Sequence, residues 1–176
     1  MKIKISNWLV GFVKPVYIKR WKDDTAGYTN YCFTDGKYIP MLDLDNTTQK
    51  EAEIICTKLV NKFKLSDFYL FKSNTGTHAV CLSKLPLHEI RQVYDFVVEN
   101  DTSHSNIGYY NKKWVLRLTD KKGQSIKYLS VVYSPYQYNY EKSKAHYTLL
   151  SKIADLTQYG INFDIGQEIE TAHYKT

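Results

Sequence analysis

The spacing of apolar residues between positions 38 and 100 constrains the fold most, because it changes between the period of a strand and that of a helix. Residues 38–45 are a strand candidate, although Pro40 suits the start or edge of a strand better than its middle. Residues 46–48, Asn-Thr-Thr, offer N-cap side chains, and apolar residues then recur at helical spacing to about Lys64. This stretch therefore predicts a strand followed by a helix.

A hairpin and a second helix follow. Residues 67–72 and 78–83 are short strand candidates joined by a loop at 73–77. Pro86 suits the start of a helix that ends near position 100. Beyond it the pattern predicts three strands and a last helix, at residues 107–110, 113–118, 126–133 and 142–158. The expected fold is α+β, with an RRM-like or ferredoxin-like split βαβ core, a mostly antiparallel sheet and flanking helices.

Composition favours one folded domain spanning residues 1–176. Hydrophobic residues make up 43% of the chain and charged residues 24%, which is typical of a globular domain. The net charge of +6 and the pI of about 9.0 favour a polyanionic partner. The 16 tyrosines fit two readings, core packing or stacking against nucleic-acid bases, and the count alone does not separate them.

The cysteines point to an intracellular protein. Cys32, Cys56 and Cys81 form no CxxC pair, so a zinc site is not expected. Their odd number and wide spacing fit reduced thiols in the cytoplasm. The N-terminal apolar stretch is interrupted by Lys14 and Pro15 and is too broken for a signal or membrane span, so no membrane partner is expected.

Two acidic residues close the first strand candidate. Asp43 and Asp45 are two positions apart, so on a strand their carboxylates point to the same side. Adjacent carboxylates repel each other unless a cation lies between them, and oxygen ligands favour Mg²⁺ or Mn²⁺. The alternative is a strand end with two solvated acids.

Two further segments carry groups that bind phosphate. The hairpin at residues 73–78 contains Ser73, Gly76 and His78, whose backbone and side-chain donors suit an anion, although an ordinary hairpin with a surface histidine has the same pattern. The predicted strand at 113–118 places Arg117 on one face, poised for a triphosphate or a carboxylate; a charged edge strand is the alternative.

The three motifs occur in an order that resembles the archaeo-eukaryotic primase superfamily, and its primase-polymerases in particular. Residues 39–45 match the family's hhhDhD/E motif, and residues 73–78 look like its sxH motif. Residues 107–118 look like the region that follows the family's third acid. The resemblance covers roughly residues 38–133 and implies the primase-polymerase version of the split βαβ core.

The resemblance also implies roles for the residues. Asp43 and Asp45 would be the catalytic ligands of Mg²⁺ or Mn²⁺. Asn106 stands where the third metal-binding acid is expected; its carbonyl can bind a metal but brings no charge, and Asp101 and Asp120 are the nearest acidic substitutes. The residues expected to bind the nucleotide are Ser73, Gly76, His78, Arg117 and Lys122.

The implied activity is that of a metal-dependent nucleotidyltransferase, a primase or primase-polymerase. Its partners would be nucleoside triphosphates and a single-stranded nucleic-acid template, with a helicase or another replication subunit beside it. Asn106 favours an alternative, a catalytically impaired protein of this fold that binds nucleic acid or nucleotide. A rolling-circle initiator is disfavoured because no two histidines are closely spaced. An adaptor protein is the remaining alternative if the motifs coincide by chance.

Overall fold

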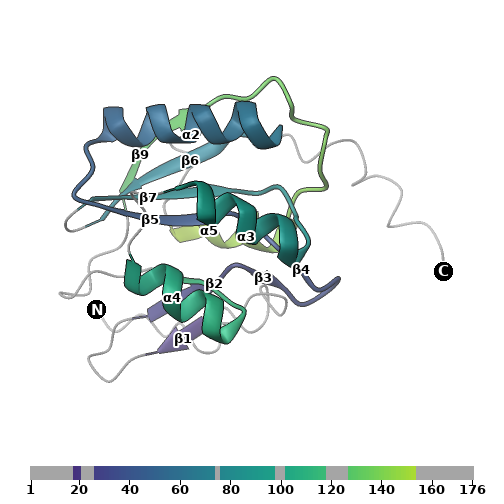
Figure 1. The fold of residues 1–176 in the computed structure, drawn as a ribbon. Coiled ribbons are helices and arrows are strands. Elements are labelled where there is room, and N and C mark those ends of the chain that lie inside the picture. The colour runs from purple at the N-terminus through teal and green to yellow at the C-terminus, as the bar shows by residue number, and fades with distance from the viewer. Residues whose placement is uncertain (1–17, 21–25, 74–75, 98–101, 118–126, 154–176) are drawn as a thin grey trace.

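The computed structural model describes residues 18–20, 26–73, 76–97, 102–117 and 127–153. Within these ranges the protein has four helices and antiparallel sheets, and its α+β class is the one that the sequence predicts (Figure 1). Among the described residues, no helix is both long and apolar enough to cross a membrane.

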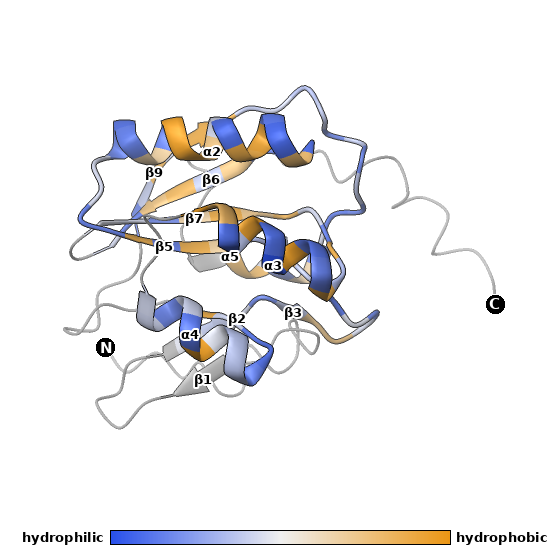
Figure 2. Ribbon diagram, viewed as in Figure 1, coloured by the Kyte–Doolittle hydropathy of each residue, from blue (hydrophilic) through white to orange (hydrophobic). Residues whose placement is uncertain are grey.

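The main sheet has four strands in the order β5-β7-β6-β9, and every neighbouring pair is antiparallel. Helices α2 and α3 cover one face, with their apolar sides turned toward the strands (Figure 2). Helix α5 and the strands β2 and β8 pack on the other face. The bounds of the sheet and its helices are β5 (Met41–Asp45), α2 (Gln49–Phe63), β6 (Phe68–Lys72), β7 (Gly76–Cys81), α3 (Leu87–Phe96), β9 (Lys127–Val132) and α5 (Lys144–Ile153).

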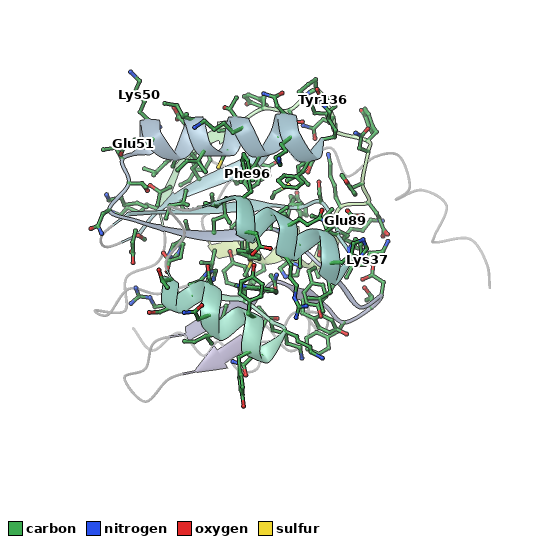
Figure 3. The ribbon with its side chains drawn as sticks, viewed as in Figure 1. Lys37, Lys50, Glu51, Glu89, Phe96 and Tyr136 are labelled. Atoms are coloured by element: carbon green, nitrogen blue, oxygen red, sulfur yellow. The ribbon has the colours of Figure 1, made fainter. Side chains whose placement is uncertain are left out.

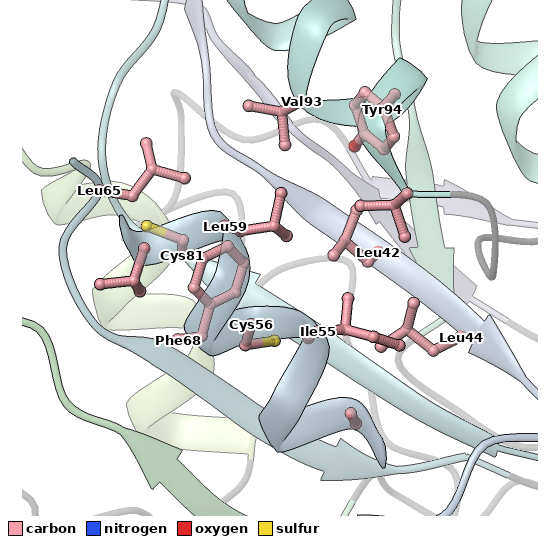
Figure 4. Close-up of a cluster of buried hydrophobic side chains, with 14 of the residues drawn as sticks. Leu42, Leu44, Ile55, Cys56, Leu59, Leu65, Phe68, Cys81, Val93 and Tyr94 are labelled. Atoms are coloured by element: carbon pink, nitrogen blue, oxygen red, sulfur yellow. The ribbon is translucent and has the colours of Figure 1, made fainter. Parts of the chain in front are cut away.

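Local sequence signals account for the first half of this sheet. Thr48 accepts a hydrogen bond from the backbone of Glu51, whose side chain accepts from the backbone of Thr48, and this capping box starts α2. Lys64, at a left-handed φ of 56°, ends the helix. Leu42 and Leu44, on one side of β5, are buried against α2 (Figure 4). The predicted strand, helix and hairpin are thus confirmed.

The predicted strand at residues 107–110 is wrong, because these residues lie in helix α4 (Thr102–Asn111). The buried side of α4 carries His104 and Gly108, whereas Ile107 and Tyr110 are exposed. The helix therefore lacks the apolar stripe by which an amphipathic helix is recognised. Strand propensity at Ile107 and Tyr110 was misleading because neither residue packs in the core.

The strand order also differs from the expected split βαβ arrangement. That arrangement places the fourth strand beside the first, but β9 pairs with β6 at the opposite edge. Strand β8 (Val115–Arg117) belongs to a separate sheet of order β1-β2-β8 and also lies beside β5. The smaller strands are β1 (Ile18–Arg20), β2 (Ala26–Thr29), β3 (Tyr31–Cys32) and β4 (Lys37–Tyr38). Strand β5 is thus an edge strand of the main sheet.

The two later helix predictions are confirmed in position but not in length. Helix α3 follows Pro86 and ends at Phe96, where the backbone of Val97 is already extended. Phe96 points from α3 toward α2 (Figure 3), where its ring meets that of Phe63 edge-on at 5.9 Å. Helix α5 begins at Lys144, and the predicted part beyond residue 153 lies outside the described residues.

A tyrosine side chain protects the open edge of β5. The Tyr94 hydroxyl donates to the carbonyl oxygen of Met41 at 2.6 Å and accepts from its amide at 3.3 Å. The Tyr94 ring is stacked on Trp114, with centroids 4.4 Å apart. Two backbone groups that would otherwise be unpaired at a sheet edge are therefore satisfied from α3.

Replacing Tyr94 by Phe should remove both hydrogen bonds and leave the buried Met41 backbone groups unpaired. We expect the free energy of unfolding, measured with urea, to fall by about 1–3 kcal/mol. Tyr110→Phe is the matched control, since Tyr110 is 89% exposed, and its effect should stay within about 0.5 kcal/mol. Equal losses in the two variants would contradict this role of Tyr94.

A buried histidine ties α5 to β2. All three cysteines are buried and unpaired, and Cys32 Sγ lies 3.5 Å from the Ser143 hydroxyl. His146 Nε2 is 2.7 Å from the Thr29 carbonyl oxygen, and Nδ1 is 2.7 Å from Ser143 Oγ. Because a carbonyl only accepts, Nε2 carries the proton and Nδ1 accepts from Ser143. Burial lowers the pKa of His146 to about 4.

This histidine should make stability fall in mild acid. The folded pKa of His146 lies below its ordinary value of 6.5, so its contribution is complete above pH 6.5 and declines as the pH falls toward 4. Between pH 7 and pH 4 the natural chain should lose up to about 3 kcal/mol more unfolding free energy than His146→Gln, which does not titrate. If the unfolding free energies of the natural chain and of His146→Gln change with pH in parallel, this role of His146 is refuted.

Candidate functional site where β5 pairs with β7

The predicted acidic pair and the predicted phosphate-binding hairpin meet in one pairing. In the antiparallel register of β5 and β7, Asp43 lies opposite His78 and Asp45 lies opposite Gly76. Both carboxylates are half-buried, whereas Leu44 between them is fully buried on the other face. Asp43 and Asp45 therefore share one face of the sheet, as the sequence predicts.

Glycine is required at position 76 by the packing of the strands. A Cβ at this position would lie 2.0 Å from the backbone oxygen of Leu44, which is far inside contact distance. The Gly76 amide donates to Ser73 Oγ at 3.0 Å, and the Ser73 amide donates to the Gly76 carbonyl at 3.1 Å. These two hydrogen bonds close the hairpin, so the Gly76 amide already has an acceptor in Ser73. Residues 74 and 75 lie outside the described residues.

His78 faces Asp43 across the two strands. Its Nε2 atom is 3.4 Å from Asp43 Oδ1, which is ion-pair range but too long for a good hydrogen bond. The imidazole is 4% exposed, and within the described ranges Nε2 makes no well-formed hydrogen bond. When it carries a proton, Nε2 is therefore a buried donor whose ion-pair partner is Asp43.

Asp43 is kept ionised by the positive groups around it. Burial raises the pKa of this carboxyl, but the contact with His78 and the charges of His104 and Arg117 outweigh that effect. The pKa of Asp43 therefore lies below its ordinary value. The four residues come from β5, β7, α4 and β8, so the cluster exists only in the folded chain.

His104 is the site residue that sequence reasoning missed. It is 9% exposed on the inner side of α4 and lies within electrostatic reach of Asp43. A Cβ on Gly108 would lie 2.0 Å from Trp114 Nε1, so α4 packs this closely only because residue 108 is glycine. The available signal in the sequence was the four-residue spacing of His104 and Gly108, which places both residues on the same side of a helix.

The other predicted site residues are less directly connected to Asp43. Asn106 is exposed on α4, about 200° around the helix from His104, and is not turned toward Asp43. Arg117 is half-exposed on β8 and acts electrostatically on Asp43. Predictions for three residues lie outside the described ranges: Asp101, Asp120 and Lys122.

The donors suit one divalent cation better than two. Within the described parts of the chain, no three side chains of His, Cys, Asp or Glu form a metal-binding group. Mg²⁺ commonly uses one or two carboxylates and completes its shell with water and substrate phosphates. Asp43 and Asp45 fit that donor set, whereas the outward Asn106 supplies no third ligand for a second ion.

The chain matches no protein-family model, no curated protein and no solved structure. The chemistry of the site is therefore argued from its own side chains. Asp43 and Asp45 share one face of the sheet, and Asp43 lies opposite His78 and within electrostatic reach of His104 and Arg117. Such a set can bind a phosphate-bearing ligand together with a cation.

Gly76→Ala should force β5 and β7 apart at the site. We expect a loss of at least about 2 kcal/mol in unfolding free energy, because the added methyl group meets backbone rather than a flexible side chain. Ser73→Ala removes a hydrogen bond at the same turn without a clash and should cost about 1 kcal/mol. A Gly76→Ala protein as stable as the natural chain would contradict this packing.

Proposed function

We propose that the protein is a primase-like nucleotidyltransferase that binds a nucleoside triphosphate at Asp43 and Asp45 and joins it to a nucleic-acid strand. The observation that carries this proposal is the meeting of three distant sequence motifs. The acidic pair lies directly opposite His78 and Gly76, and Arg117 from a third segment acts on Asp43. Chance motifs have no reason to gather around one carboxylate.

Each side chain has a role that follows from its surroundings. Asp43 and Asp45 would hold a Mg²⁺ or Mn²⁺ ion, and the low pKa of Asp43 keeps it ready to do so. Such an ion, when bound, would promote attack of the 3′-hydroxyl on the α-phosphate and neutralise the charge of the pyrophosphate that leaves as the bond between the α- and β-phosphates breaks. His78 would donate to a phosphate oxygen, and the planar guanidinium of Arg117 would bind two such oxygens.

The split βαβ core of primase-polymerase type is part of the same proposal. The run β5-α2-β6-β7, with β7 between β5 and β6, fits the first three strands of that core. Strand β9 departs from it by pairing with β6 at the far edge, while β8, which contacts β5, belongs to a separate sheet. A replication partner such as a helicase would accompany this activity.

A second function, binding of nucleotide or nucleic acid without turnover, is favoured by α4. Asn106 is exposed there, and His104 takes the inward position beside Asp43. A histidine at this place adds a phosphate donor rather than a third acid. The described site would then retain triphosphate while supporting slow or no transfer.

Incorporation of labelled nucleotide on a single-stranded template with Mg²⁺ or Mn²⁺ tests both functions. The double variant Asp43→Asn, Asp45→Asn should lower the rate at least about 100-fold, because it removes the charge that holds the cation. Glu141→Gln is a suitable control, since it removes a carboxylate that is 59% exposed and bound to Lys84.

Three outcomes are informative. Full activity of the double variant would refute the proposed transferase. Equal losses in the double variant and in Glu141→Gln would point to net charge rather than to the acidic pair. Triphosphate binding by the natural chain with no incorporation would favour the second function instead.

A further inference from the structure

The turn between β3 and β4 carries an exposed aromatic group. The ring of Tyr31 meets Phe33 edge-on at 4.9 Å and Tyr38 at 5.1 Å. Tyr38 is 7% exposed and anchors the group, whereas Phe33 is 47% exposed. We call these three residues the turn cluster. Phe33 therefore exposes a large apolar ring to solvent, and the buried Tyr38 anchors the cluster.

A lysine lies over the turn cluster. The Lys113 ammonium is 4.8 Å from the centroid of Tyr31 and 5.3 Å from that of Phe33. The acid in this turn, Asp35, is bound by Lys84 at 2.8 Å, and the same lysine also binds Glu141 at 2.6 Å. Lys37 lies at the same end of the molecule (Figure 3). The surface around Phe33 is therefore both aromatic and positively charged.

Strand β8 connects this surface to the candidate site. Lys113, Val115 and Arg117 are half-exposed and alternate with two fully buried side chains, those of Trp114 and Leu116. The strip that they form begins at the turn cluster and ends at Arg117, which acts on Asp43. Lys113 and Arg117 are four positions apart, which in extended chain is about 13 Å and matches about four stacked nucleotides.

We propose that single-stranded nucleic acid binds along this strip, with a base stacked on Phe33 and phosphates at Lys113 and Arg117. Aromatic rings beside cations are the usual surface for unpaired strands, because every base has a face to stack and every phosphate a charge. An acidic peptide would satisfy the lysines but offers no regular planar faces. The net charge of +6 complements a polyanion. One part of this proposal rests on the proposed function, namely that the end of the bound nucleic acid lies at Asp43.

Fluorescence anisotropy with labelled oligothymidine tests this surface. Phe33→Ala should weaken binding about 10-fold through lost stacking, without changing the salt dependence. Lys113→Ala should reduce the slope of log K against log salt by about 0.7, the value for one phosphate contact on a single strand. Phe33→Trp, which keeps a stacking face, should bind at least as tightly as the natural chain.

The matched control is the double variant Tyr133→Ala, Lys58→Ala. Tyr133 is 80% exposed and follows β9 at the opposite edge of the sheet, and Lys58 is exposed on α2. Its affinity should stay within about 2-fold of the natural chain, although it changes net charge as Lys113→Ala does. Equal losses in this control, or natural affinity in Phe33→Ala, would overturn the proposal. Duplex binding as tight as single-strand binding would overturn it as well.

The two proposals fail in different ways. Suppose that the natural chain incorporates no nucleotide, but that Phe33→Ala and Lys113→Ala bind oligonucleotide more weakly than it does. The strip then stands and the transferase fails. If incorporation depends on Asp43 and Asp45 while Phe33→Ala binds oligonucleotide normally, the transferase stands and the strip fails. In the expected result, Phe33→Ala loses oligonucleotide affinity and keeps triphosphate affinity.

Discussion

The pairing register of β5 with β7 is the constraint on which the rest of the site depends. It sets Asp43 opposite His78 and Asp45 opposite Gly76, and it holds only because residue 76 has no side chain to meet the Leu44 backbone. A slip of one residue would turn both carboxylates into the apolar layer under α2 and bring Leu44 to the other face. Buried Leu42 and Leu44 make that slip costly, so packing on one face fixes the chemistry on the other.

The charge on Asp43 illustrates how a site of this kind is maintained. A half-buried carboxylate is disfavoured by desolvation, yet the pKa of Asp43 is lowered because His78, His104 and Arg117 surround it. Removing any one of these three partners would leave the negative charge of Asp43 less well stabilised. The same cluster that stabilises an ionised acid is suited to a phosphate ligand, whose charge the histidines and the arginine can meet.

The edge position of β5 gives the site its access. A central strand would have neighbours on both sides, whereas β5 pairs with β7 on one side only and is protected at Met41 by the Tyr94 hydroxyl. Tyr94 in turn stacks on Trp114, which leads directly into β8. The aromatic packing that stabilises the sheet edge thus also places Arg117 near Asp43.

The sequence was enough to predict the strand, helix and hairpin from β5 to β7, because each rests on local signals such as the Thr48 capping box and the alternation around Asp43 and Asp45. It also determined which motifs could bear chemistry. The tertiary structure was needed to show that α4 is a helix, that β9 pairs with β6, and that the buried His104 is within electrostatic reach of Asp43. These features depend on contacts between distant segments, such as Gly108 against Trp114, and no local periodicity records them.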